Sequence, residues 1–146
     1  MVHTKLYRVI YGDTDKAGVV YYGNYLRFFE IGRTEFFRDL ANLSYKDLEE
    51  EGIMMPVVEA YVRYKSPAFY DDLLSIETAI SGLDDYSVTF FYRITRHGED
   101  KVIVQGSTKL TVVDKEKGSI RKMPSKLLNL LDPLVIRPEP QKANLN

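Results

Sequence analysis

The sequence contains no cysteine and only two histidines, His3 and His97, in 146 residues. The absence of cysteine excludes disulfides, thiolate metal sites and cysteine nucleophiles. Two histidines per chain also make a histidine-rich metal site unexpected. There is no excess of positive charge, since the formal net charge is −1, and this disfavours a protein that binds nucleic acid through a general basic field.

Long apolar runs are missing as well. No stretch approaches the roughly 20 apolar residues that a membrane-spanning helix needs. The first residues, M-V-H-T-K-L-Y-R-V, lack the apolar segment of a secretory signal peptide. We therefore expect a cytoplasmic protein with no membrane span. Its hydrophobic content of 45% and charged content of 28% are typical of a globular protein, and we predict a single domain over residues 1–131.

The first third of the chain predicts one strand and one long helix. A strand is expected over residues 5–11, followed by an acidic loop over residues 12–18. The helix is expected over residues 25–41, with aromatic residues at spacings of three and four on one face and Asn24 as its N-cap. Gly32 lies on that face and costs about 1 kcal/mol of helix stability relative to alanine, so we expect another element to pack closely there.

The rest of the chain predicts a short helix and then strands. Ser44 is the expected N-cap of a helix that ends at Glu51 and is closed by Gly52. Alternating apolar residues then predict four strands, over residues 54–65, 74–80, 86–94 and 102–112. Short turns between them favour an antiparallel meander, with the long helix across it.

The C-terminal part predicts a short helix or arm from Ser125, and then an extended or disordered tail over residues 132–146, which holds three prolines. Aromatic and β-branched residues exceed what one helix can cover on such a sheet. We therefore expect a second chain to cover the surplus, in a homo-oligomer.

The acidic loop after the first predicted strand has two aspartates, Asp13 and Asp15, and ends at Gly18. It fails the calcium-loop template, because Ala17 and Asn24 stand where oxygen ligands belong and a strand precedes it. Two interpretations stay open. The aspartates cap backbone N–H groups in a turn, or one of them is a functional carboxylate beside the positive end of a helix.

Two segments resemble a known family. Residues 12–30, G-D-T-D-K-A-G-V-V-Y-Y-G-N-Y-L-R-F-F-E, resemble the signature segment of the 4-hydroxybenzoyl-CoA thioesterase family, and residues 64–74, Y-K-S-P-A-F-Y-D-D-L-L, look like its P-A-x-Y-x-D loop. The likeness covers about residues 5–113. It implies an α+β hotdog fold, in which a five-stranded antiparallel sheet wraps a long helix. It also implies hydrolysis of a small acyl-CoA without metal or cofactor.

The resemblance assigns roles to particular positions. The family's catalytic carboxylate falls on Asp15, and Asp13 becomes a structural residue of the loop. The backbone N–H that polarises the thioester carbonyl falls on Tyr22, with Gly23 beside it at the helix start. This agrees with the residues themselves, because free N–H groups at a helix start favour a developing oxyanion. An acidic residue at the position of Glu30 faces the acyl pocket in the family.

The resemblance also implies partners. The family places its active site between two subunits, in a dimer or a dimer of dimers, so a homotetramer is one expected assembly. The chain is similar to the Tol–Pal-associated branch too, but Tyr22 stands where that branch has histidine, so no role for an imidazole is expected. His97 falls in a predicted hairpin turn and reads as a loop residue.

The substrate side of the site is less defined. Tyr21, Tyr25, Phe28 and Phe29 are expected to form an aromatic wall that suits an aromatic or an aliphatic acyl group. The carrier is either CoA or an acyl carrier protein. Five basic residues are candidate ligands for CoA phosphates: Arg63, Lys65, Arg121, Lys122 and Lys126.

Two other functions are alternatives to thioester hydrolysis. A hotdog dehydratase would need a histidine shortly after an aspartate at the helix entry, and none occurs there. A non-catalytic module that binds acyl groups or acyl carrier protein remains an alternative. For Glu30, the alternative to a pocket residue is a solvated glutamate paired with Arg33 on the next turn.

Overall fold

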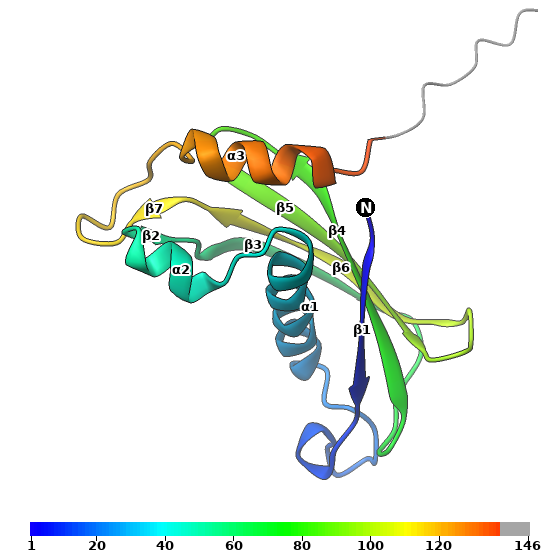
Figure 1. Ribbon diagram of the computed structural model, residues 1–146. Helices are drawn as coiled ribbons and strands as arrows, with labels where there is room; N and C mark the ends of the chain where they lie inside the picture. The colour runs from blue at the N-terminus through cyan, green and yellow to red at the C-terminus, as the bar shows by residue number, and fades with distance from the viewer. Residues whose placement is uncertain (138–146) are drawn as a thin grey trace, which may run out of the picture.

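A computed structural model of the chain describes residues 1–137 and shows one long helix lying across one face of a curved sheet (Figure 1). The helices and strands, with two short 3-10 turns, follow the order β1 (His3–Arg8), η1 (Tyr11–Asp13), α1 (Asn24–Leu40), α2 (Tyr45–Glu50), β2 (Ile53–Met54), β3 (Val57–Tyr64), β4 (Leu73–Leu83), β5 (Ser87–Arg96), β6 (Val102–Thr111), β7 (Val113–Asp114), α3 (Ser125–Leu131) and η2 (Asp132–Leu134). None of these helices is long and apolar enough to cross a membrane.

The main sheet has five antiparallel strands in the order β1-β4-β5-β6-β3. The expected meander is confirmed for β4, β5 and β6, which follow one another through hairpins. It is wrong for β3, which pairs with β6 at the far edge and not with β4. The chain therefore crosses from one side of the sheet to the other between β3 and β4. This crossing uses residues 65–72, the segment that contains the P-A-F-Y-D-D sequence.

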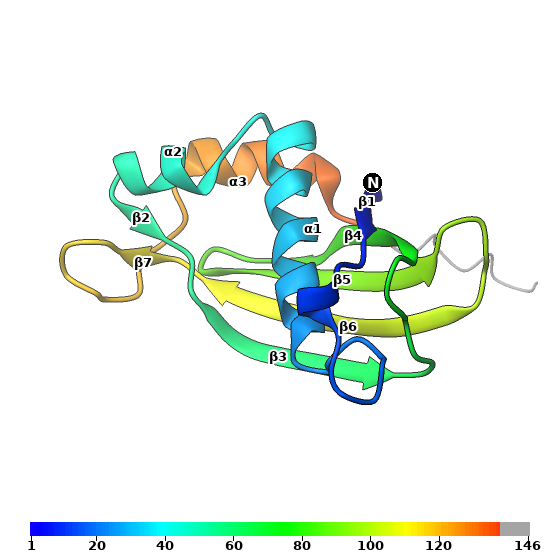
Figure 2. The same cartoon turned by 90° about the horizontal axis from the view of Figure 1, so that it is seen from below.

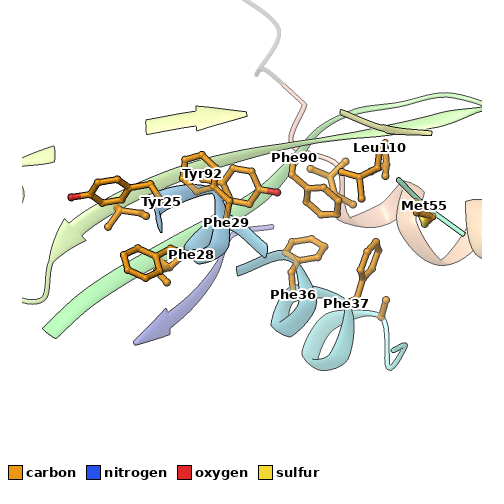
Figure 3. Close-up of a cluster of buried hydrophobic side chains, with 14 of the residues drawn as sticks. Tyr25, Phe28, Phe29, Phe36, Phe37, Met55, Phe90, Tyr92 and Leu110 are labelled. Atoms are coloured by element: carbon orange, nitrogen blue, oxygen red, sulfur yellow. The ribbon is translucent and has the colours of Figure 1, made fainter. Parts of the chain in front are cut away.

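Helix α1 packs on the inner face of the sheet, where it lies mainly against β4 and β1 and also touches β5 (Figure 2). Its aromatic face is buried as expected: Phe28, Phe29 and Phe36 have no exposed surface. Phe29 stacks on Tyr92 of β5 with ring centroids 4.2 Å apart. Figure 3 shows these rings in one cluster with other side chains of the sheet. Such stacking adds to the free energy gained from the apolar area that is buried.

Gly32 is the point of closest approach between α1 and the sheet. A Cβ built on it would collide with Thr78 Oγ1 and lie 2.9 Å from Ile76 Cγ2, both on β4. The expectation that another element packs against Gly32 is confirmed. The missing side chain lets the helix backbone rest on the strand.

Several boundaries differ from expectation for local reasons. The first strand ends at Arg8 and not at residue 11, because Tyr11 to Asp13 form a 3-10 turn. Pro56 divides the strand expected over residues 54–65 into β2 and β3, and β2 pairs with β7. Gly82 lies within β4, at an irregularity in its pairing with β5, and does not begin a turn.

The predicted short helices are present. Ser44 caps α2: its side chain accepts from Asp47 N–H at 3.1 Å, and the Asp47 carboxylate accepts from Ser44 N–H at 2.9 Å. Helix α3 begins at Ser125. The following residues, assigned to the tail by sequence, are structured up to residue 137, because Val135 bridges to Ile80 of β4. Residues 138–146, the rest of the predicted tail, lie outside the described residues.

Replacing Gly32 by alanine tests the contact between α1 and β4. Alanine favours a helix by about 1 kcal/mol over glycine, but the added methyl must displace Thr78 or Ile76, and overpacking of this kind costs about 1–3 kcal/mol. We expect the free energy of unfolding, measured by urea denaturation, to fall by about 1 kcal/mol. Gly82→Ala is the control, since its Cβ meets Thr89 at an ordinary 3.5 Å. A more stable Gly32→Ala variant would contradict the close packing.

Candidate active site

A fully buried carboxylate, that of Asp13, lies where β1, the acidic loop and α1 meet. Its Oδ2 accepts from Tyr7 OH at 2.7 Å and from Ile10 N–H at 2.9 Å, and its Oδ1 is paired with the Arg27 guanidinium. Burial opposes the charge on Arg27, but contacts with Tyr7 and Asp13 raise the pKa of the guanidinium. Burial and the bond to Asp13 raise the pKa of the Tyr7 phenol. The network therefore pairs the Asp13 carboxylate with the Arg27 guanidinium.

The backbone of the same residue positions the start of α1. The carbonyl of Asp13 accepts from Tyr21 N–H at 2.9 Å and from the Asn24 side chain at 2.8 Å. Asn24 was expected as the N-cap that accepts from the helix. That prediction is wrong, because Gly23 occupies the cap position without a side-chain bond, and Asn24 is the first helical residue. Its amide is used to hold the acidic loop.

Asp15 lies in a small turn of the loop, and its side chain is exposed. Its Oδ1 accepts from Ala17 N–H at 2.8 Å, and its own N–H donates to Val19 O at 2.9 Å. Gly18 closes the turn with a φ of +85°, a conformation that glycine adopts without strain. One carboxylate oxygen is thus fixed by the turn, and the other has no hydrogen-bond partner within residues 1–137. The interpretation that the loop aspartates cap backbone N–H groups is correct for this bond and for the bond from Ile10 N–H to Asp13.

Asp15 and the helix start lie close together. The pKa of the Tyr21 phenol is raised, mainly by the neighbouring Tyr22 phenol and also by the negative charge of Asp15. Within the described chain, the amides of Tyr22 and Gly23 donate to no hydrogen-bond acceptor. The carbonyl of Tyr22 accepts from Tyr64 OH at 3.1 Å, which ties the helix start to β3. A carboxylate and two free amides therefore share this corner of the molecule.

A cavity of about 320 Å³, here called the entry cavity, opens beside this corner. It is lined by Val19, Val20, Tyr22, Tyr25, Tyr64, Lys65, Ser66 and Pro67. Of the aromatic wall expected from the sequence, only Tyr25 lines it. Phe28 and Phe29 belong to the core under the helix, so that part of the expectation is wrong. Burial raises the pKa of Tyr25 to about 12, and its phenol stays neutral.

Two further cavities continue along a groove between α1 and residues 53–64, the segment that contains β2 and β3. The middle cavity, about 400 Å³, is lined by Leu26, Arg27, Glu30, Arg33, Val57, Ala60 and Thr108. The Arg33 cavity, about 290 Å³, is lined by Glu30, Arg33, Tyr45, Glu49, Ile53, Met54, Met55 and Pro56. As residue numbers rise along α1, they fall along the facing segment of residues 53–64, so the three cavities lie in sequence along the groove.

Glu30 lines both of these cavities and is exposed. The ion pairs among residues 1–137 do not include a pair between Glu30 and Arg33, whereas the similar pair of Glu35 and Arg38 is present at 2.6 Å. The sequence placed Glu30 either in a pocket or in a surface ion pair. The structure places it on the groove.

Other candidate groups lie elsewhere. His97 follows β5 in the loop that leads to β6, with its Nδ1 3.3 Å from Ser75 Oγ. Among residues 1–137 there is no group of three or more side chains arranged to hold a metal ion. Of the five basic residues proposed for CoA phosphates, Lys65 lines the entry cavity.

A family model described as the thioesterase-like superfamily matches residues 9–131. The chain belongs to this superfamily. It is 34% identical over 121 residues to the acyl-CoA thioester hydrolase YbgC of Escherichia coli O6:H1, a match that covers 83% of this chain and 89% of the relative. The superfamily consists of hotdog proteins that include thioester hydrolases, and the fold expected from the sequence is confirmed.

Solved structures agree with this placement. The hypothetical protein TT1821 of Thermus thermophilus superposes with a TM-score of 0.86 at 26% identity, covering 94% of this chain and all of the other. The DHNA-CoA thioesterase of Staphylococcus aureus superposes with a TM-score of 0.78 at 27% identity, covering 83% and 80% of the two chains.

Sequence reasoning missed three residues that shape the site: Tyr7, Arg27 and Tyr64. The partner of Arg27, Asp13, lies fourteen positions earlier in the chain, and such a spacing leaves no periodic signal. Tyr7 and Tyr64 read as ordinary strand residues. A loop aspartate and a helix arginine at the same end of a helix were the only available signal for the Asp13–Arg27 pair.

Replacing Arg27 by methionine tests whether its pair with the buried Asp13 carboxylate holds the site together. Asp13 would keep two neutral donors but lose its counter-ion, and a buried charge deprived of a partner costs about 1–3 kcal/mol or more. We expect the free energy of unfolding, measured by urea denaturation, to fall by about 2 kcal/mol.

The matched control is Arg38→Met on the same helix. Arg38 is paired with Glu35 at the surface, where such pairs contribute at most about 1 kcal/mol. Equal losses in both variants would contradict a special role for the Asp13–Arg27 pair.

Proposed function

We propose that this protein is an acyl-CoA thioesterase that hydrolyses the thioester to the free acid and CoA. The observation that supports it most directly is the juxtaposition at the start of α1: an exposed carboxylate, two amides without acceptors, and a cavity beside them. The E. coli relative is named an acyl-CoA thioester hydrolase, and we transfer that activity to this chain.

In this proposal Asp15 acts on the thioester carbonyl. As a general base, its carboxylate takes a proton from water, and the resulting hydroxide adds to the carbonyl carbon. As a nucleophile, it adds to the same carbon itself and forms a mixed anhydride, which water then cleaves. In both routes the C–S bond breaks, and the CoA sulfur leaves as a thiolate that takes up a proton.

The amides of Tyr22 and Gly23 would receive the charge that develops on the carbonyl oxygen. Backbone N–H groups at a helix start are fixed in direction and lie at the positive end of the helix dipole. Removing one such donor in other enzymes costs about 3–4 kcal/mol of transition-state stabilisation. The Tyr64 hydroxyl holds the Tyr22 carbonyl, and so fixes the plane of the neighbouring peptide.

Replacing Asp15 by asparagine tests the catalytic assignment. Asparagine keeps the size of the side chain and its acceptor for Ala17 N–H, but it cannot take a proton or attack as an anion. We expect kcat for acyl-CoA hydrolysis, measured by release of free thiol, to fall at least about 100-fold, with little change in thermal stability.

The control is Asp100→Asn, another exposed aspartate, in the loop after β5, which should leave kcat unchanged. After a single turnover in ¹⁸O-labelled water, label in the Asp15 carboxyl would identify the nucleophile route, because it requires a mixed anhydride that water attacks at the Asp15 carbon. An Asp15→Asn variant as fast as the wild type on every substrate would contradict a catalytic role for Asp15.

We further propose that the functional unit is a homo-oligomer, a dimer or a dimer of dimers, joined through β3. This strand is one of the two edges of the sheet. Four of its side chains, Val57, Val58, Tyr61 and Tyr64, are between 43% and 59% exposed. Such an exposed apolar edge is a typical place for a second strand to pair.

Replacing Ala60 by proline tests this assembly. Lys65 N–H donates to Ile103 O of β6. The N–H groups of successive residues in a strand point to opposite sides, and Ala60 is five residues from Lys65, so the N–H of Ala60 points to the free edge. Proline removes that N–H but keeps the ladder with β6. We expect light scattering to show a wild-type oligomer and a 16.9 kDa variant monomer with an unchanged circular dichroism spectrum.

Ala60→Ser, which keeps the N–H, should remain oligomeric. A wild-type protein that is monomeric at all concentrations would refute the proposed assembly.

A non-catalytic module that binds acyl groups or acyl carrier protein is the second candidate. In that case the Asp15 side chain would only stabilise its turn. This second candidate predicts that the wild type and Asp15→Asn both bind acyl-CoA or acyl carrier protein and that neither releases thiol.

A further inference from the structure

Arg33 is a cation whose surroundings in the described chain supply no counter-ion. It lies on α1, one turn after Glu30, and its Nε is buried without a hydrogen-bond partner. It is absent from the ion pairs found among residues 1–137. Desolvation of a guanidinium is costly unless an anion or several acceptors replace the lost water.

The groups nearest to Arg33 are phenols. The oxygens of Tyr45 and Tyr92 oppose the effect of burial and raise the pKa of the guanidinium. Tyr92 is already engaged, because its OH is 2.6 Å from Thr108 Oγ1. The hydroxyl of Tyr45 is buried and has no partner in the described chain. Two unsatisfied donors, Arg33 Nε and Tyr45 OH, therefore line the same cavity.

Two carboxylates, Glu30 and Glu49, also line the Arg33 cavity. Both side chains are exposed, so water screens their charges. In contrast, the Nε of Arg33 and the hydroxyl of Tyr45 are buried. A ligand that reaches the inner end therefore meets donors, and a planar guanidinium matches a carboxylate through two parallel bonds.

The position of this cavity sets the size of the ligand. Arg33 comes nine residues after Asn24, the first residue of α1, which is about 14 Å along the helix axis. The middle cavity lies between, with Leu26, Val57 and Ala60 as its apolar lining. A group anchored by its carbonyl at the helix start must have a long apolar body to reach Arg33.

We infer that the Arg33 cavity binds a carboxylate at the far end of a long acyl chain, so that the enzyme prefers ω-carboxyacyl-CoA substrates. This inference rests on the proposed thioesterase function and extends it to a substrate class. The thioester lies at Tyr22 and Asp15, the chain follows the groove, and Arg33 and Tyr45 bind the terminal carboxylate.

The experiment compares substrates matched in length. The probes are dodecanedioyl-CoA and dodecanoyl-CoA, with hexanedioyl-CoA and hexanoyl-CoA as a pair too short to reach Arg33. We expect kcat/KM for the twelve-carbon pair to favour the ω-carboxylate about tenfold or more, as one charge-assisted hydrogen bond provides. The six-carbon pair should show no such preference.

Variants locate the effect. Arg33→Met should remove the twelve-carbon preference, Arg33→Lys should keep part of it, and Tyr45→Phe, which deletes only the hydroxyl, should reduce it. Glu30→Gln should increase the preference by removing a like charge from the mouth. The exposed Arg38→Met is the matched control and should keep the wild-type ratio.

Affinity separates this inference from the proposed function. Calorimetry with Asp15→Asn measures binding of the two twelve-carbon thioesters without turnover. If the wild type hydrolyses neither thioester, and Asp15→Asn binds dodecanedioyl-CoA more tightly than dodecanoyl-CoA, the thioesterase proposal fails and the carboxylate site stands. If both thioesters are cleaved and bound equally well, the site is refuted and the thioesterase stands. If Arg33→Met lowers the oligomeric mass but keeps the ratio, Arg33 pairs with a second copy of the chain, and the inference is wrong.

Discussion

The buried carboxylate of Asp13 is the constraint on which the site depends. A carboxylate without water is tolerated only when donors surround it, and here the donors come from three different elements. Tyr7 belongs to β1, Ile10 to the loop and Arg27 to α1. Satisfying one charge therefore brings the strand, loop and helix together. The carbonyl of Asp13 then accepts hydrogen bonds from Tyr21 and Asn24. Asp13, which has no catalytic role in the proposed function, thereby positions the start of α1, where the proposed catalytic groups lie.

The elements that the sequence predicted well are those with local signals. Helix α1 has an unbroken aromatic period, α2 has a capping box, and β5 and β6 form a hairpin around Gly98. The position of β3 could not be predicted in this way. Alternation over residues 54–65 shows that a strand exists but not which strand it pairs with. The crossing to the far edge of the sheet depends on the path of residues 65–72, which has no periodic signal.

The site residues, too, could be predicted only where the signal is local in sequence. The motif that suggested Asp15, Tyr22 and Glu30 is local in sequence, and the structure brings the first two to one corner and leaves Glu30 on the groove. Phe28 and Phe29 were misplaced because both the sheet and the groove lie beside α1, and a helical period cannot say which of them an aromatic face meets. The ties through Arg27 and Tyr64 join residues far apart in the chain, so only the folded structure shows them.

The contact at Gly32 has a mechanical consequence for the groove. Because no side chain separates α1 from β4 there, the helix cannot move toward the sheet to make room for a larger ligand. The opposite wall, β3, is held by a single neighbouring strand and has an irregular pairing near its start. Adjustment to ligands of different width would therefore fall on β3 and on the contact that it makes with a second chain in the proposed oligomer, while the acidic loop and the start of α1 keep their alignment.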